Sequence, residues 1–533
     1  MGTEQIYKTY TEHPDPVKAV IKGNFPKWLS GGLVRNGPGM FDIGEDKINH
    51  WFDGLGIMHR FSFKDGEVTY RSKYLRGDTY ERCMKENRIA FTGFGSVHYP
   101  DPCKNIFRRF LSYFRMEEPT DNCNVNFINV GDDYFVCTET KMMRKIDIET
   151  LDTKEKIDVS NYVTVQVSTA HPHYGLEDGA TFNMGSQFGK ETSYNIIKVP
   201  RPDKGQNDSL EKAEILYKIP ATYPRSPSYY HSFGITDNYI VFVEQPLTMN
   251  LLRLFTARIR GVGMNTCFDF SSTTPVRFHL VNRETAEHVS TKYLADSFFV
   301  FHHINAYEDD GNVVVDLCAY TDDTIMNSLY MADLRKSGEE GAKKWRETPN
   351  VFPRRYVFPI NITEDTPKGE NLVKLDYTDA TAVLKEEEDG SVYVHCVHDD
   401  LVSQEEVPGY EAPNVNYWKY SGRKYQFAYG LCVHDKGTVM NKLVKLDVRN
   451  KKAVGLWHEK DMYPSEPIFI ASPDSKSEDD GVIVSAVTSV LPDKPGFLLV
   501  MDAKTFTEVA RAEVPIDVPW GIHGTYAPPQ NKE

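Results

Sequence analysis

Residues 301–311, FHHINAYEDDG, decide the fold of this chain. They read as a short apolar strand that carries histidine and ends at an acidic tight turn, after which residues 313–315, VVV, return as a second strand. An Asp-Gly pair between two β-prone runs is among the strongest short-range hairpin signals, because glycine accepts the positive φ that the turn needs. The stretch therefore predicts a β-hairpin with histidine on its first strand.

The same layout occurs twice earlier in the chain. His171 and His303 each precede an Asp-Gly turn by seven residues, and His231 precedes an Asp-Asn turn by six. Side chains alternate along a strand, so only one of His302 and His303 can face inward, and the matched spacing selects His303. Three histidines at one place in three successive hairpins predict three side chains that point at one centre. That centre would be a metal ion.

Turn signals between β-prone runs recur along the whole chain, at Asp65-Gly66, Asp132-Asp133, Asp178-Gly179, Asp237-Asn238, Asp310-Gly311, Asp389-Gly390 and Asp480-Gly481. Many short strands with regular turns indicate a sandwich, a barrel or a propeller. Recurrence of one unit about seven times favours a propeller of four-stranded blades, with a double sandwich as the alternative. We therefore expect an all-β, seven-bladed β-propeller that occupies residues 1–533 as a single domain. Insertions, helical at residues 327–336 and 338–346, would form a helical or loop cap over one face.

Composition restricts the partners and the compartment. The net charge is −15, from 76 acidic and 61 basic residues, which argues against nucleic acid because phosphate binding needs a basic face. The eight cysteines form no CxxC pair, which is typical of free thiols in a reducing compartment. The first twenty residues show neither a signal core nor a transit pattern, and no apolar run approaches the roughly 20 residues of a spanning helix. We expect a cytoplasmic protein that is at most attached to a membrane surface.

A fourth histidine and three glutamates complete the candidate site. His523 lies on the last apolar strand, where a propeller closes on itself. Glutamates interrupt apolar, core-type sequence, and a buried carboxylate without a partner costs several kcal/mol. A metal-bound histidine has a free ring N–H that a carboxylate can accept, although a structural arginine, lysine or backbone N–H would serve a glutamate equally well. The glutamates are Glu139, Glu411 and Glu466.

All of these residues except Glu411 lie in motifs that run nearly end to end along the chain: LVRNGPG at 33–39, NHWFDG at 49–54, PDPCKNIF at 100–107, CTET at 137–140, TAHPH at 169–173, SYYHSFG at 228–234, FHHIN at 301–305, YPSEP at 463–467 and HG at 523–524. With these motifs the chain resembles the carotenoid cleavage oxygenases, in particular the animal branch with the β-carotene oxygenases and the retinoid isomerohydrolase. The resemblance implies a seven-bladed propeller and an Fe(2+) ion held by His171, His231, His303 and His523. It also implies that Glu139, Glu411 and Glu466 stand behind His231, His303 and His523 respectively.

The resemblance further implies the chemistry. The expected reaction is cleavage of one conjugated C=C bond of a carotenoid or retinoid with O2, with no catalytic side chain beyond the metal site. The stretches at 244–251, 257–261 and 512–516 are most similar to the eccentric 9′,10′-cleaving oxygenases. Central 15,15′ cleavage with or without isomerisation, retinyl-ester isomerohydrolysis and a carotenoid-binding protein without activity remain as alternatives. Phe52 and Phe94 are candidates for the lining of a substrate tunnel, and a homodimer is left open.

Two stretches interleave apolar residues with arginines, at 107–116 and 249–260. On an acidic chain such segments can lie in the headgroup region of a bilayer and admit lipid-soluble substrates. A helix docked on the propeller is the alternative interpretation. The candidate membrane contacts are Phe107, Phe110, Leu111, Phe114, Leu251, Leu252, Leu254 and Phe255.

Overall fold

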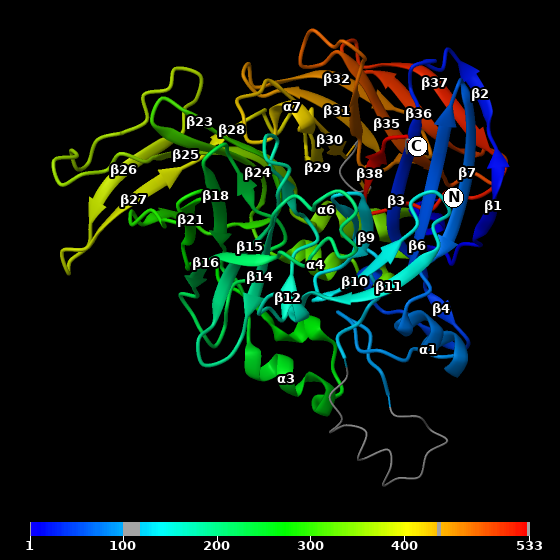
Figure 1. The fold of residues 1–533 in the computed structure, drawn as a ribbon, viewed down its shortest axis with the longest axis horizontal. Helices are drawn as coiled ribbons and strands as arrows, with labels where there is room; N and C mark the ends of the chain where they lie inside the picture. The colour runs from blue at the N-terminus through cyan, green and yellow to red at the C-terminus, as the bar shows by residue number, and fades with distance from the viewer. Residues whose placement is uncertain (1, 100–117, 434–438, 530–533) are drawn as a thin grey trace.

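Seven β-sheets follow one another around a ring in sequence order, from blue at the right through green and yellow to red in Figure 1. The structure is a computed structural model that describes residues 2–99, 118–433 and 439–529. The all-β, seven-bladed propeller predicted from the turns is confirmed. We number the sheets as blades 1 to 7, beginning with the sheet that holds both chain ends.

In each blade the first-named strand is the innermost one. Blade 1 consists of β38 (His523–Ala527), β3 (Gly31–Met40), β6 (Leu55–Lys64), β7 (Glu67–Tyr74) and β1 (His13–Lys18). Blade 2 consists of β8 (Asn126–Val130), β9 (Asp133–Cys137), β10 (Met142–Ile146) and β11 (Thr153–Asp158). Blade 3 consists of β12 (Val167–Ser168) and β13 (His173–Tyr174), which both pair with β14 (Thr181–Gln187), then β15 (Ser193–Val199) and β16 (Glu214–Pro220).

Blade 4 consists of β17 (Gly234–Ile235), β18 (Tyr239–Glu244), β21 (Val276–Asn282), β22 (Tyr293–Ala295), β27 (Val392–Val397) and β26 (Thr381–Glu386). Blade 5 consists of β23 (Phe299–Asp309), β24 (Asn312–Tyr320), β25 (Val351–Pro359) and β28 (Asp399–Asp400). Blade 6 consists of β29 (Glu411–Asn414), β30 (Phe427–Cys432), β31 (Lys442–Asp447) and β32 (Lys452–His458). Blade 7 consists of β33 (Met462–Pro464) and β34 (Ile468–Ala471), which both pair with β35 (Gly481–Ser489), then β36 (Gly496–Asp502), β37 (Thr507–Val514) and β2 (Val20–Gly23).

The ring is closed by strands from opposite ends of the chain. The C-terminal strand β38 pairs with β3, with His523 opposite Asn36. The N-terminal strand β2 pairs with β37 in blade 7. Because these two blades mix early and late strands, the first and last segments of the chain hold each other in place.

The hairpin at residues 301–311 forms as predicted, between β23 and β24. Asp310 and Gly311 both have positive φ, 44° and 73°, which is the backbone of a type I′ hairpin turn. The turn at Asp389-Gly390 also forms, but it joins β26 and β27, a hairpin that extends blade 4 through a parallel pairing of β22 with β27 and projects at the left of Figure 1.

Short helices connect the strands and cover the ring. They are η1 (Thr3–Tyr7), η2 (Trp51–Asp53), α1 (Asp78–Glu86), η3 (Val159–Asn161), α3 (Leu251–Arg260), η4 (Met264–Cys267), α4 (Thr324–Ser328), α5 (Met331–Leu334), α6 (Gly338–Glu347) and α7 (Tyr417–Tyr420). The insertion between β24 and β25 carries α4, α5 and α6, so the helix predicted at 338–346 is present, whereas the one predicted at 327–336 is split in two. Two-stranded ribbons are formed by β4 (Asp42–Ile43) with β5 (Asp46–Lys47) and by β19 (Leu247–Met249) with β20 (Phe268–Phe270).

Candidate metal centre

Four histidines from four blades meet at the centre of the ring. They are His171, between β12 and β13; His231, just before β17; His302, on β23; and His523, the first residue of β38. One ring nitrogen of each lies within 4.8 Å of the corresponding nitrogens of the other three. Residues that are far apart in the chain therefore offer four imidazoles to one point.

The Nε2 atoms face one another at metal-ligand spacing. The distance is 2.8 Å from His171 to His231, 3.1 Å from His231 to His302, and 3.1 Å from His302 to His523. Imidazoles bound at right angles about 2.1 Å from one ion would place their nitrogens about 3 Å apart. Four converging lone pairs repel one another unless a cation lies between them, so the donor set fits a divalent transition metal such as Fe(II).

The prediction of His303 in this cluster is wrong, because His302 lies there. Strand β23 shifts register against β24 twice, between Val300 and His303 and again between His303 and Asn305. Counting residues back from the turn assumes an unbroken alternation, and an irregularity of this kind reverses the side that each residue faces. The ring of His303 turns away, with its Nδ1 atom 2.8 Å from the Oγ atom of Ser232.

Three of the histidines have a carboxylate behind them. Glu139 Oε1 lies 2.6 Å from the Nδ1 atom of His231, as predicted. Glu466 Oε1 lies 3.1 Å from Nδ1 of His523, also as predicted. Glu411 Oε2 lies 2.5 Å from Nδ1 of His302, so this glutamate pairs with the neighbour of the expected residue. Each Nδ1–H donates to its carboxylate, which fixes the tautomer and leaves the Nε2 lone pair for a metal.

Each glutamate has its own support from a different residue. The hydroxyl of Tyr229 donates to Glu139, with 3.0 and 2.9 Å to its two oxygens. The hydroxyl of Tyr320 lies 3.3 Å from Glu411 Oε1. Arg35 is fully buried, and its Nη1 atom lies 2.8 Å from Glu466 Oε2. The sequence does not reveal the supporting role of these residues, although Arg35 and Tyr229 both stand inside motifs quoted above.

The cluster takes one side chain from every blade. Blades 3, 4, 5 and 1 supply the histidines, while Glu411 opens β29 of blade 6 and Glu466 lies between β33 and β34 of blade 7. Glu139 follows β9 of blade 2. A sevenfold ring therefore converts seven positions near the inner strands into one four-nitrogen, three-carboxylate centre.

The pKa shifts follow from burial and from these pairs. Burial, together with the neighbouring His231, holds the pKa of His171 well below its usual range, and burial lowers the pKa of His523 to about 4. Burial would raise the pKa of Glu411, but His302 outweighs it and the net shift is downward. Burial would lower the pKa of His302, but the contact with Glu411 outweighs burial and the net shift of this pKa is upward. A metal ion at the Nε2 atoms would take the place of a proton on His302.

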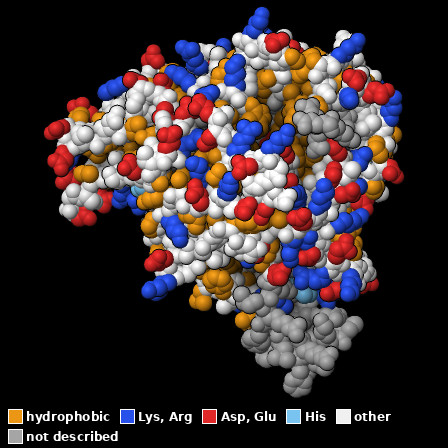
Figure 2. Space-filling model, viewed as in Figure 1, with side chains coloured by type: hydrophobic (Ala, Val, Ile, Leu, Met, Phe, Trp, Pro, Cys, Tyr) orange, Lys and Arg blue, Asp and Glu red, His pale blue; other side chains and the backbone are white. Residues whose placement is uncertain are grey.

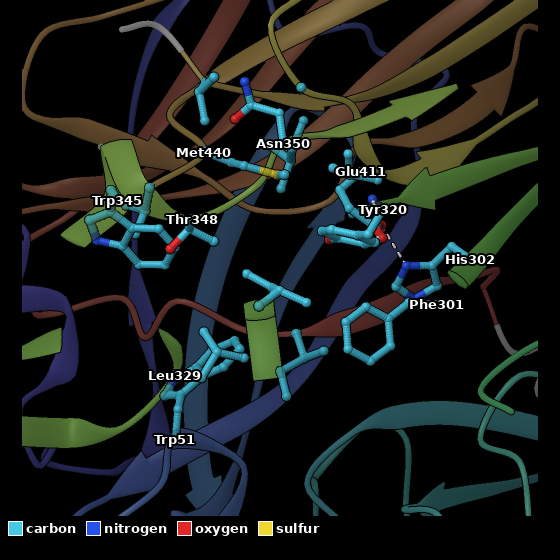
Figure 3. A pocket seen from close by; sticks show the side chains of 18 of the residues that line it. Trp51, Phe301, His302, Tyr320, Leu329, Trp345, Thr348, Asn350, Glu411 and Met440 are labelled. Atoms are coloured by element: carbon cyan, nitrogen blue, oxygen red, sulfur yellow. Dashed lines mark hydrogen bonds and ion pairs between the residues drawn. The ribbon is translucent and has the colours of Figure 1, made fainter. Parts of the chain in front are cut away.

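An apolar cavity opens onto the cluster. Its empty volume is about 1200 Å³, part of which is open to solvent. His231, His302 and His523 form one end. The walls come from the loops and short helices of the cap and from inner strands, and include Trp51, Phe52, Phe301, Tyr320, Leu329, Trp345 and Met440. In Figure 3, His302, Phe301, Tyr320 and Glu411 lie at one end and Trp345 and Thr348 at the opposite side. Phe52 therefore lines the cavity as predicted, whereas Phe94 packs behind it at 5.8 Å between ring centroids.

The candidate membrane contacts have different outcomes. Phe107, Phe110, Leu111 and Phe114 lie outside the described residues. On α3, Leu251 is buried and Leu254 half-buried, whereas Leu252 and Phe255 are 75% and 63% exposed. Figure 2 shows hydrophobic side chains at the lower end of the molecule, where Figure 1 places α3. Among the described residues, every helix is too short or too polar to span a bilayer.

The chain is similar to known proteins over nearly its whole length. The family model described as "RPE65: Retinal pigment epithelial membrane protein" matches residues 7–528. The chain is 43% identical over 530 residues to a protein of Macaca fascicularis named "Carotenoid-cleaving dioxygenase, mitochondrial", with 98% of this chain and 94% of the relative covered. It is also 43% identical over 526 residues to "Beta,beta-carotene 15,15'-dioxygenase" of Rattus norvegicus, with 97% and 90% covered.

Solved structures show the same fold at lower identity. An apocarotenoid oxygenase/RPE65 chimera matches with a TM-score of 0.76 and 21% identity, covering 98% of each chain. A cobalt-substituted Synechocystis apocarotenoid oxygenase matches with a TM-score of 0.75 and 21% identity, covering 99% of each chain.

The prediction of a cytoplasmic location is contradicted by these comparisons. Four relatives that are 42–44% identical, from Macaca fascicularis, Mustela putorius furo, Pongo abelii and Homo sapiens, are named as mitochondrial. The sequence argument rested on the lack of a recognisable targeting pattern, and that lack does not outweigh four relatives matched over nearly the whole chain.

Proposed function

We propose a reaction for a chain that belongs to the RPE65 family, whose animal members include the carotenoid-cleaving dioxygenases. The protein is an enzyme of this class, and its reaction adds O2 across one conjugated C=C bond of a carotenoid. The two carbons of that bond leave as two carbonyl groups, each with one oxygen atom, so no other oxidant is consumed. The apolar cavity lined by three of the four converging imidazoles carries the proposal.

The metal in this proposal is Fe(II), held by His171, His231, His302 and His523. Imidazole nitrogen suits Fe(II), and a bound iron would supply the dioxygen chemistry that neither a hydrocarbon substrate nor these side chains provide. The carboxylates of Glu139, Glu411 and Glu466 keep the proton on each partner Nδ1 atom, so that each Nε2 stays a metal ligand.

The cavity walls determine how the substrate is held. Trp51, Phe301 and Trp345 offer aromatic faces to a polyene and exclude water from it. Since the cavity ends at the histidines, a long substrate must enter lengthwise and present one double bond to them. Holding that bond in place is the main contribution of the polypeptide to the rate.

We place the cleavage at the 9′,10′ bond, on the resemblance of residues 244–251, 257–261 and 512–516 to eccentric oxygenases. Overall identity does not choose the bond, because relatives named carotenoid-cleaving dioxygenase and 15,15′-dioxygenase are both 43% identical. We further propose a mitochondrial location, contact of α3 with a lipid surface, and a single catalytic domain at residues 1–533, which is supported by strands from both ends closing the ring.

The experiment is incubation of the iron-loaded protein with β-carotene under ¹⁸O2, with product identification by mass spectrometry. We expect two carbonyl products of unequal length, each labelled with ¹⁸O: a long apocarotenoid aldehyde from C10′ and a short methyl ketone from the methyl-bearing C9′. Labelled retinal alone would move the cleavage to the 15,15′ bond and leave the reaction class intact. In a parallel incubation with vesicles that contain retinyl ester, release of retinol, together with no labelled carbonyl product from β-carotene, would replace the dioxygenase with an isomerohydrolase. A coloured complex with unchanged carotenoid would mean that the protein binds carotenoid without cleaving it.

A further inference from the structure

One buried arginine contacts the metal centre from behind. Arg35 lies on β3 and is fully buried. Its Nη1 atom donates to Glu466 Oε2 at 2.8 Å, and its Nη2 atom donates to the carbonyl oxygens of Gly521 and Ile522 at 3.2 and 3.0 Å. A single guanidinium therefore holds both the carboxylate partner of His523 and the two residues that lead into His523.

The three carboxylates of the centre do not have equivalent neighbours. Glu139 and Glu411 accept hydrogen bonds from the neutral hydroxyls of Tyr229 and Tyr320. Among the described residues, Arg35 is the only arginine or lysine that forms an ion pair with one of the three glutamates. A guanidinium stays charged under ordinary conditions, so the arginine removes one of three negative charges.

The resulting charge matches a divalent ion. Three carboxylates and one guanidinium leave two negative charges in a buried site, and an M²⁺ ion brings the sum to zero. His59, paired with Arg35 across the strands, does not alter the count, because burial lowers its pKa to about 3 and it is neutral at pH 7. An uncompensated charge in a low-dielectric interior is costly, so a trivalent ion is disfavoured relative to a divalent one.

We propose that Arg35 is a positioning residue of the metal centre, which orients His523 through Glu466 and sets the charge of the site to suit a divalent ion. The inference rests on the iron centre proposed above and extends it to a residue that touches neither metal nor substrate. The two effects of Arg35 are separable. Any cationic side chain at this position would supply the positive charge, whereas the orientation of Glu466 needs the planar, forked guanidinium of arginine.

The charge effect is tested by the reduction potential of the bound iron in the intact protein, titrated and followed by the electron paramagnetic resonance signal of Fe(III). Arg35→Gln removes a positive charge, so Fe(III) gains at least about tenfold over Fe(II), a fall of about 59 mV. Glu466→Gln removes a negative charge and shifts the potential upward. The double variant restores the net charge of the site. Its Fe(III)-to-Fe(II) ratio at a given potential should therefore lie within about threefold of the wild-type ratio.

The orientation effect is tested by Arg35→Lys, which keeps the charge and loses the fork. We expect its potential to stay at the wild-type value while a chelator removes iron several-fold faster. The control is Arg355→Gln, which breaks the buried ion pair of Arg355 with Asp316 in blade 5, with 2.8 Å between Arg355 Nη2 and Asp316 Oδ2. It should lower the unfolding temperature without moving the potential.

Three outcomes are decisive. Shifts of Arg35→Gln and Glu466→Gln in the same direction, or no larger than that of the Arg355 control, would overturn the assignment. If Arg35→Gln fails to fold, the upward shift of Glu466→Gln and the behaviour of Arg35→Lys still decide it. A wild-type protein that takes up no iron would instead refute the proposed metal centre, which is a separate result.

Discussion

The Nδ1 atom of His302 lies 2.5 Å from the Oε2 atom of Glu411, although 109 positions separate the two residues in the chain. The contact joins blade 5 to blade 6, and it identifies which of two adjacent histidines belongs to the centre. Because the neighbouring His303 bonds to Ser232 instead, the two residues differ in function despite their adjacency.

This difference is tested by the matched variants His302→Asn and His303→Asn. The first removes one of four ligands, so we expect metal content to fall well below one equivalent and cleavage activity to drop by more than about 100-fold, beyond the effect of losing an outer partner. The second keeps all four ligands and should keep its metal. Metal analysis beside steady-state rates gives the comparison, and equal losses in both variants would contradict the assignment.

The carboxylates can be tested in the same way. Glu411→Gln leaves His302 in place but weakens the acceptor of its Nδ1–H, so metal affinity should fall about 10- to 100-fold. Glu308→Gln is the control. Glu308 lies on β23, the strand of His302, but it accepts a hydrogen bond from Thr236 next to blade 4 instead of contacting the metal centre. Competition with a chromophoric chelator measures both affinities. An unchanged affinity in Glu411→Gln would mean that the contact is structural only.

Stability should fall as the pH drops below about 6.5, the ordinary pKa of histidine. Burial lowers the folded-state pKa of His59 to about 3. Between these values the unfolded chain binds one more proton at this site than the folded chain does. The free energy of unfolding therefore falls by about 1.4 kcal/mol per pH unit for this residue alone. Urea titrations at several pH values between 4.5 and 6.5 give the free energy of unfolding as a function of pH. The slope of this free energy against pH should be smaller in His59→Gln than in the wild type by roughly this amount.

The lipid contact proposed for α3 predicts weaker vesicle binding in Leu252→Glu/Phe255→Glu. Both side chains are mostly exposed, and burying each in a bilayer contributes roughly 1.5–3 kcal/mol, so partitioning should fall at least tenfold. Val392→Glu/Val397→Glu on β27 is the matched control, since these residues are 47% and 41% exposed on a different part of the ring. Cosedimentation with phospholipid vesicles measures both, and an equal loss would remove α3 from the proposal.

Local sequence signals predicted much of this structure. The Asp-Gly turn at 310–311 forms with the expected positive φ at both residues, and the recurrence of such turns indicated a propeller. His171, His231 and His523 meet as expected, because an inner strand near the axis leaves few directions for its side chains. The pairing of Glu139 with His231 and of Glu466 with His523 was available only through the resemblance to a family.

The missed features depend on contacts that local sequence does not encode. The register shifts on β23 arise from pairing with β24, so no count along residues 299–309 reveals them, and the choice of His303 failed for that reason. The ion pair of Arg35 with Glu466 spans 431 positions. Likewise, the hairpin at Asp389-Gly390 has the same local pattern as the others but extends blade 4, because its place is decided by pairing with β22.

The strand that seals the ring begins with the fourth imidazole, at His523. During synthesis the ribosome adds His523 221 positions after His302, so a nascent chain holds three of the four imidazoles throughout that interval. Capture of a metal ion by all four histidines would then wait for β38 to dock against β3, because the four imidazoles come together only when that strand is in place. Closure of the propeller ring by β38 and completion of the four-histidine site are therefore the same step.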